Sequence, residues 1–178
     1  FLLIHADIVP VAPTRWITKI IAEADGAHAD LMSVLSPIKN ADGFTSTGLI
    51  STEHPKERRL TVTEAAKLPP TFKAEHLAKI LGWEADTNTR LLVNTGCMLV
   101  DLRRNREKWE TMHFQTHDDV VKVDGKWKAT FVPEDWDFSM QAHDRGLTVA
   151  VTKAITLIHN GNIDYRNDAV WGKETDTQ

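Results

Sequence analysis

The chain has 178 residues, of which 42% are hydrophobic, so it can bury one substantial core but is too short for two ordinary domains. The net charge of −4 and the pI near 6.1 exclude the broad basic surface that binds polyanions, and we expect no nucleic-acid partner. The single cysteine, Cys97, allows neither an intramolecular disulfide nor a thiolate cluster for zinc, which favours a reducing, cytoplasmic compartment.

The sequence contains no apolar run near the roughly 20 residues that span a bilayer, so we expect no transmembrane segment. The opening FLLIHADIVP also lacks the basic start of a signal peptide. Because Phe1 already lies inside an apolar run, we expect further residues to precede it in the native protein. An exposed edge of this first strand would favour association between copies of the chain.

Strands and a helix alternate in the first part of the chain. Phe1 to Ile4 is a continuous apolar run, typical of a strand covered on both faces. The isoleucines and alanine from Ile17 to Ala24 recur at helical spacing and predict a core-facing helix that ends near Gly26. Leu31 to Ile38 predicts a second strand. The stretch from Lys39 to Pro70 has weak periodicity and predicts a long surface excursion.

The second part is more clearly patterned. Arg90 to Val100 is strongly apolar around a polar break, and a short helix is expected within residues 105–113. Val120 to Val132 alternates around Asp124-Gly125, which predicts a β-hairpin. A helix from Pro133 to about Arg145 and two short strands at 148–151 and 154–159 follow. We therefore expect one α/β domain over residues 1–161, a mostly parallel sheet flanked by helices with one hairpin, and a polar tail at 162–178.

Asp7 follows the end of the first strand, where open α/β sheets place ligand-binding groups. A carboxylate there can hold a hard divalent cation, although an aspartate that caps the next turn is equally compatible with the position. His159 ends an apolar strand and is either a metal ligand or a hydrogen-bonded structural residue. His5, two positions before Asp7, lies on the same strand face and could join a metal site only if the strand end is distorted.

Glu134 and Asp135 open the predicted late helix, where two carboxylates stabilise the positive end of the helix dipole. The spacing adds a distinction, because Asp135 shares a helix face with Phe138 and Ala142, whereas Glu134 and Asp137 lie on the polar face. An inward carboxylate is a candidate general base.

Polar and aromatic residues beside these groups are candidates for substrate contacts. Asn94-Thr95-Gly96 interrupts an apolar run and is either a bulge or a place where amides approach a ligand. Trp136 either stacks on a sugar ring or belongs to the core.

Four segments, in order, resemble the signature blocks of GT-A glycosyltransferases, including bacterial and phage-associated members: FLLIHADIVP, LLVNTGCMLVDLR, FVPEDWDFSMQAHDRGLTVAV and ITLIHNG. The segment DGFTSTGLIS also resembles a loop of some such members. In that family a strand ends in an Asp-x-Asp-like motif that binds Mn²⁺ or Mg²⁺ and the donor diphosphate. A Glu-Asp helix start then supplies the base that acts on the acceptor, and a later strand ends in a metal-contacting histidine.

The resemblance implies Asp7 and His159 as metal ligands and Asp135, with Glu134 beside it, as the base. It also implies that Asn94, Thr95 and Gly96 line the donor-sugar or acceptor pocket. His5 stands where the family has its first carboxylate, and either replaces that ligand or leaves metal binding weak. The strand-helix-strand unit that normally grips the nucleotide base has no counterpart in this sequence, so the resemblance implies a partial chain or an incomplete donor site.

The leading hypothesis is metal-dependent transfer of a sugar from a nucleotide diphosphate sugar to an acceptor hydroxyl. The main alternative is a non-catalytic nucleotide- or carbohydrate-binding relative, which would bind without turnover. A metal-dependent hydrolase that uses Asp7 and His159 is a third hypothesis, and it would release free sugar without an acceptor.

Overall fold

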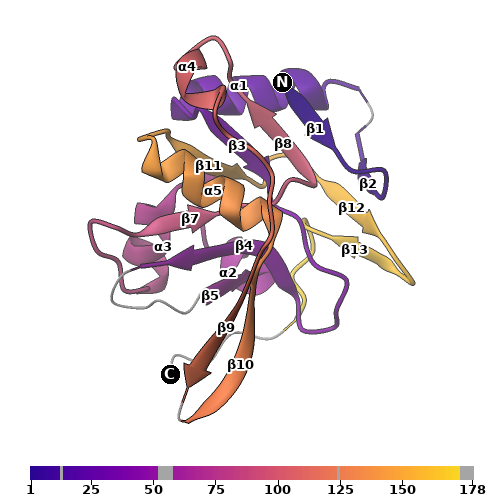
Figure 1. Cartoon of the computed structure of the whole chain (residues 1–178). Coiled ribbons are helices and arrows are strands. Elements are labelled where there is room, and N and C mark those ends of the chain that lie inside the picture. The colour runs from indigo at the N-terminus through magenta and orange to yellow at the C-terminus, as the bar shows by residue number, and fades with distance from the viewer. Residues whose placement is uncertain (13, 52–57, 124, 173–178) are drawn as a thin grey trace.

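A computed structural model describes residues 1–12, 14–51, 58–123 and 125–172 of the chain (Figure 1). Its helices are α1 Trp16–Ala27, α2 Val62–Ala66, α3 Ala74–Leu81, α4 Arg106–Trp109 and α5 Glu134–Asp144. Its strands are β1 Leu2–Ile4, β2 Ile8–Pro10, β3 Leu31–Val34, β4 Phe44–Ile50, β5 Arg58–Thr61, β6 Thr71–Phe72, β7 Arg90–Leu92, β8 Cys97–Val100, β9 His117–Val123, β10 Lys126–Val132, β11 Val149–Thr152, β12 Leu157–Asn160 and β13 Asp164–Arg166. Across these residues, every helix is too short or too polar to cross a bilayer.

The central sheet is mixed, with the strand order β1-β8-β3-β11-β6. The pair β3 and β11 is parallel, whereas β1–β8, β8–β3 and β11–β6 are antiparallel. The other described strands form small antiparallel sheets, and strand residues outnumber helix residues by 32% to 25%. The predicted GT-A-like, Rossmann-like fold with a mostly parallel, helix-flanked sheet is therefore wrong.

The expected surface excursion contributes much of this difference. It contains β4, β5 and α2, and β4 lies at the centre of the three-stranded sheet β5-β4-β7. The sequence of β4, FTSTGLI, concealed the strand because Thr45 and Thr47 are polar yet fully buried. The Thr45 hydroxyl donates to the Leu60 carbonyl at 2.7 Å, which offsets the cost of removing it from water. Residues 52–57 of the excursion lie outside the described residues.

Both faces of the central sheet are covered. On one face, Ile20 and Ala24 of α1 pack with Met32 and Val34 of β3. Leu31 belongs to the larger core on the other face, because successive residues of a strand point to opposite sides. That larger core joins the central sheet to α5 and to the β5-β4-β7 sheet through Phe138, Ala142, Leu60, Leu91, Val149 and Val151.

The ends of the central sheet are less covered than the sequence suggests. β1 is an edge strand, and its Leu2 and Leu3 pack against the cores on opposite faces of the sheet, as predicted. Phe1 and Ile4, at the two ends of the predicted strand, are exposed. On α1, Ile17 and Ile21 are also exposed, and the core-facing stripe of this helix is narrower than its isoleucine spacing predicts.

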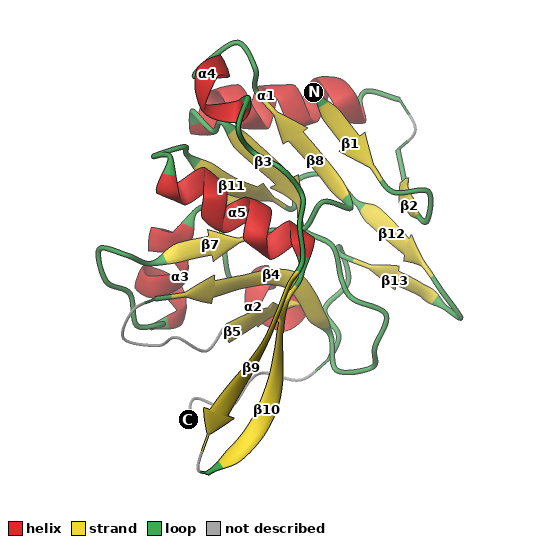
Figure 2. Ribbon diagram, in the orientation of Figure 1, coloured by secondary structure: helices red, strands yellow, loops and turns green. Residues whose placement is uncertain are grey.

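The predicted hairpin is confirmed as β9 and β10, and Figure 2 shows the half nearest its turn projecting beyond the other strands and helices. Trp127 pairs with Lys122 and Phe131 with Asp118. These two aromatic residues are 70% and 60% exposed, so the hairpin adds little to the core. Asp124, in the predicted turn, lies outside the described residues.

Residues 162–172, expected to begin a polar tail, pack against the domain instead. β13 pairs with β12, and Tyr165 is buried. The Asn167 side chain donates to the carbonyls of Leu35 and Ile155 at 2.8 and 3.0 Å. The prediction of a polar tail missed these buried contacts. Residues 173–178, the rest of the predicted tail, lie outside the described residues.

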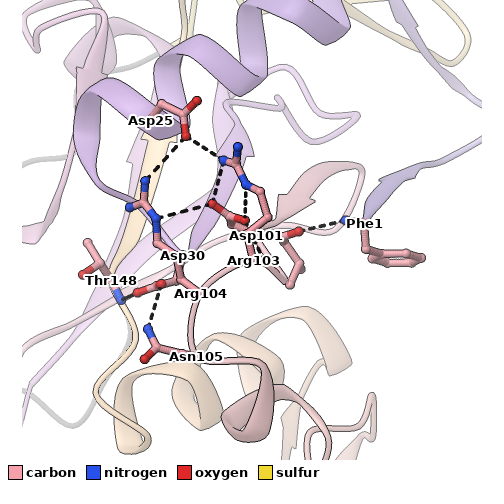
Figure 3. Close-up of polar contacts among 9 residues, drawn as sticks. Phe1, Asp25, Asp30, Asp101, Arg103, Arg104, Asn105 and Thr148 are labelled. Carbon is pink, nitrogen blue, oxygen red and sulfur yellow. Dashed lines mark hydrogen bonds and ion pairs between the residues drawn. The ribbon is translucent and has the colours of Figure 1, made fainter.

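A cluster of charged side chains ties the end of α1 to the segment after β8 (Figure 3). Arg103 donates to both oxygens of Asp101, each at 2.8 Å, and its guanidinium also reaches Asp25 at 2.7 Å. Arg104 lies 3.7 Å from Asp101. The hydrogen bond from Arg103 holds the pKa of Asp101 below its ordinary value. We call these four residues the Asp101 cluster.

Candidate active site

Asp7 and His159 lie side by side although 152 positions separate them in sequence. β2 pairs with β12, so that Ile8 lies opposite His159, and the Asn160 amide donates to the Asp7 carbonyl at 2.8 Å. Asp7 Oδ2 is 3.2 Å from His159 Nε2. Two of the three residues predicted as metal ligands are thus in contact.

The His159 ring is held in one orientation by the backbone. Its Nδ1 lies 2.7 Å from the Pro37 carbonyl, and because a carbonyl can only accept, Nδ1 carries the proton. In the neutral imidazole the Nε2 lone pair therefore faces Asp7. A histidine whose second nitrogen donates to a carbonyl is the usual arrangement of a metal ligand.

Lys39 is the third member of this group, which we call the Asp7 site. Its Nζ is 2.7 Å from Asp7 Oδ2, and this hydrogen bond is the main reason that the pKa of Asp7 lies below its ordinary value. The sequence did not single out Lys39, because it opens the stretch that was taken for a surface excursion. Its side chain reaches Asp7 alongside Gly161, the residue that follows β12.

His5 points to a different neighbour. Its Nε2 is 3.2 Å from Thr95 Oγ1, and its backbone amide donates to the Gly96 carbonyl at 2.9 Å. The structure does not bring the His5 ring together with Asp7 and His159, and among the described residues no group of three or more His, Cys, Asp or Glu side chains could hold a metal ion.

A two-ligand site suits a cation that a substrate also binds. Mg²⁺ is commonly held by one or two carboxylates together with substrate phosphates and waters, and imidazole is an accepted ligand of first-row metals. The Asp7 carboxylate and the oriented Nε2 of His159 fit this pattern. They do not form the closed set of protein ligands that a structural metal requires.

The polar break at Asn94-Thr95-Gly96 is a buried turn between β7 and β8. The Asn94 side chain donates to the Val34 carbonyl at 3.2 Å and accepts from the Gly96 amide at 2.8 Å. A Cβ at Gly96 would lie 3.0 Å from Asn94 Oδ1, so this tight turn favours glycine. These contacts give Asn94 and Gly96 a role in shaping the wall beside His5.

Asp135 and Glu134 differ as their helix positions predict. Glu134 is exposed at the start of α5, and Asp135 is half-buried. Burial raises the pKa of Asp135 to about 6, and the charge of Glu134 also raises it; the Trp136 amide, which donates to Asp135 at 2.8 Å, and the positive charge of Arg59 oppose the rise. A carboxyl group with this pKa exchanges protons readily near neutral pH.

Trp136 is buried rather than presented to a ligand. Its indole N–H donates to the Ser46 carbonyl at 2.9 Å, and the Arg59 guanidinium lies 4.1 Å from the centre of its ring. The Ser46 amide in turn donates to the Ser36 carbonyl. Ser36 directly precedes Pro37, whose carbonyl accepts the hydrogen bond from His159. Backbone and indole contacts therefore connect the start of α5 with the Asp7 site.

Asp137 is a buried carboxylate that sequence spacing placed on the polar face of the helix. Its Oδ1 lies 2.9 Å from His117 Nε2, and its Oδ2 accepts from Gln141. The base of the hairpin packs over this face of α5, which the helical pattern alone does not reveal.

No protein-family model matches the chain, and neither the curated proteins nor the solved structures contain a significant match. A functional assignment therefore depends on the sequence pattern and on the geometry of these groups.

Proposed function

We propose that this protein is a glycosyltransferase that moves a sugar from a nucleotide diphosphate sugar to an acceptor hydroxyl, with Mn²⁺ or Mg²⁺ as cofactor. The observation that carries the proposal is the contact between Asp7 and His159, at 3.2 Å. The resemblance to GT-A glycosyltransferases predicts these two residues as metal ligands. Their proximity supports that prediction independently, since 152 positions separate them.

Asp7 and His159 would hold the cation from one side and leave its other positions to the donor. A cation in this place would supply positive charge to the leaving diphosphate. The hydrogen bond to the Pro37 carbonyl keeps the His159 imidazole in a fixed orientation. The proposed contribution of these residues is thus to fix the donor rather than to react with it.

Asp135 is the proposed base for the acceptor hydroxyl. A pKa of about 6 leaves it mostly ionised at pH 7, and a base whose pKa lies near the working pH is the most effective. Glu134 is exposed and acts through its charge, which raises the pKa of Asp135. This half-buried carboxyl with a raised pKa favours an enzyme over a non-catalytic relative.

The cytoplasm is the compartment we propose for this activity. Burial raises the pKa of Cys97 to about 12, so this thiol is unreactive at neutral pH.

Nucleotide sugars and a hydroxyl acceptor are the proposed partners.

The decisive experiment is calorimetric titration of the protein with UDP and GDP, each with and without Mn²⁺. Asp7→Ala and His159→Ala should abolish the metal-dependent part of the binding. Asp144→Ala is a matched control for Asp7→Ala, because Asp144 is also an exposed aspartate, 53% exposed and paired with a cation, Arg90. It lies on α5, about 14 Å from Asp135 along the helix. Failure of the wild type to bind either nucleotide with Mn²⁺, or equal binding by Asp7→Ala, would reject the proposal.

A transfer assay then separates the alternatives. Asp135→Asn should lower the transfer rate by about 10²- to 10⁴-fold while leaving donor affinity nearly unchanged, and Glu134→Gln should have a smaller effect. Equal loss of transfer and donor binding would reject Asp135 as the base. Metal-dependent binding without turnover would identify the non-catalytic relative, and release of free sugar without an acceptor would identify a hydrolase.

A further inference from the structure

A positive charge already lies where a divalent cation is expected. Lys39 Nζ is 2.7 Å from Asp7 Oδ2, the same oxygen that faces His159 Nε2. An ammonium and a divalent cation that approach one carboxylate oxygen together would repel each other strongly. A divalent cation that binds Asp7 Oδ2 beside His159 Nε2 would therefore displace Lys39 from this oxygen.

The side chain of Lys39 is free to make that movement. The side chains of Lys39 and Asp7 are 37% and 45% exposed, and ion pairs so close to solvent are easily exchanged. The ammonium ends a flexible four-carbon chain. Gly161 leaves room for this chain, because a Cβ at Gly161 would lie 3.1 Å from Lys39 Cδ.

The backbone of Lys39, by contrast, is fixed beside the site. The Ile38 amide donates to the Phe44 carbonyl at 2.9 Å, and the Asn40 amide donates to the Ile38 carbonyl at 2.8 Å. Pro37, two residues earlier, accepts the hydrogen bond from His159. Lys39 therefore stays next to Asp7 and His159 even when its ammonium has left the carboxylate.

We propose that Lys39 is the resident cation of the Asp7 site: it neutralises Asp7 before the divalent cation arrives and contacts the diphosphate of the donor afterwards. The first part requires only that Asp7 and His159 bind a divalent cation, whereas the second part rests on the proposed function. An ammonium is a suitable partner for a diphosphate because it is a compact charge with three donors. Lys39 would then compete with the metal in the free protein and cooperate with it in the donor complex.

The test compares Lys39→Met with the wild type in two separate titrations. Without nucleotide, the affinity for Mn²⁺ should rise by about 3- to 10-fold, because the competing charge is gone. With saturating Mn²⁺, the affinity for UDP or GDP should fall by about 5- to 20-fold, because a charge-assisted hydrogen bond to the diphosphate is lost. Methionine keeps most of the chain that lies along Gly161, and the melting temperature reports whether the variant is folded.

Two further variants control for general effects. Arg90→Met removes a similarly exposed cation, 35% exposed and paired with Asp144, and should leave both affinities unchanged. Lys39→Arg keeps the charge and should restore most of the nucleotide affinity.

The possible results separate the two proposals. Unchanged Mn²⁺ affinity in folded Lys39→Met overturns the first part, and undiminished nucleotide affinity overturns the second. A wild-type protein that binds Mn²⁺ but neither nucleotide overturns the proposed function together with the second part, while tighter Mn²⁺ binding by Lys39→Met would still support the first.

Discussion

The Asp101 cluster and the Asp7 site are both built around one aspartate with a cationic partner. They differ in how exposed the carboxylate is and in how many of its oxygens are in contact with the partner. Asp101 is 5% exposed and Asp7 45% exposed. The Arg103 guanidinium donates to both carboxylate oxygens of Asp101, and the Arg103 backbone amide donates to the same carboxylate. At Asp7, the contacts with Lys39 and His159 both fall on Oδ2.

This difference separates a carboxylate that holds the fold together from one that can exchange its partner. A planar guanidinium that binds two carboxylate oxygens is geometrically specific, and removing it from a buried carboxylate is costly. A single ammonium on an exposed carboxylate contributes little and can be replaced. The oriented histidine beside Asp7 adds a second candidate ligand, which the Asp101 cluster lacks among the contacts described.

The largest effect on stability is expected for Asp101→Asn, which removes the charge that holds Arg103 and Arg104. The free energy of unfolding at pH 7 should fall by about 2–3 kcal/mol, and Mn²⁺ binding should not change. Because the folded protein lowers the pKa of Asp101, the stabilisation is present above the ordinary pKa and is lost as pH falls through the lowered value. Urea unfolding at pH 7 and pH 3 measures both effects, and a constant difference between these pH values would contradict the assignment.

A smaller effect of opposite sign is expected for Asp135→Asn. The folded protein raises the pKa of Asp135 from 3.8 to about 6, so ionisation destabilises the fold progressively as pH rises between these values. At pH 7 the variant should be more stable than the wild type by about 1–2 kcal/mol, and below pH 4 the two should be alike. Thermal unfolding from pH 4 to pH 7 follows this divergence; a less stable variant at pH 7 would show that the Asp135 charge is stabilised in the fold.

The smallest change in stability is expected for Asp7→Asn. An exposed ion pair of this kind contributes little, so the free energy of unfolding should stay within about 0.5 kcal/mol of the wild type. Metal binding should nevertheless be lost, since asparagine supplies no negative charge. A loss of stability as large as that of Asp101→Asn would place Asp7 among the structural carboxylates and remove the contrast between the two regions.

Local patterns predicted the later part of the chain well. The alternation around residues 124–125 predicted the hairpin, and proline at 133 with glycine at 146 marked the limits of α5. Helical spacing separated inward Asp135 from exposed Glu134, because the two positions differ by about 100° around the helix axis. These features depend on neighbours within a few residues.

Patterns failed where burial depends on distant segments. β4 is rich in threonine and serine, and its place inside a sheet depends on partners from β5 and β7. The same reason explains why Asp137 and residues 162–172 were taken as solvent-facing. Strand direction was also missed, because sequence patterns that show a strand do not show whether its neighbour runs parallel.

The sequence by itself determined the candidate residues, because Asp7, Asp135 and His159 stand at the ends of expected elements, within segments that resemble glycosyltransferase signature blocks. The tertiary structure decided which of them lie in contact. Pairing of β2 with β12 joined Asp7 to His159 and the packing of residues 36–39 added Lys39, whereas the turn at residues 5–7 sent His5 to Thr95. Sequence spacing fixes direction only along one element, and contacts between elements are set by how the sheets and their connecting segments pack.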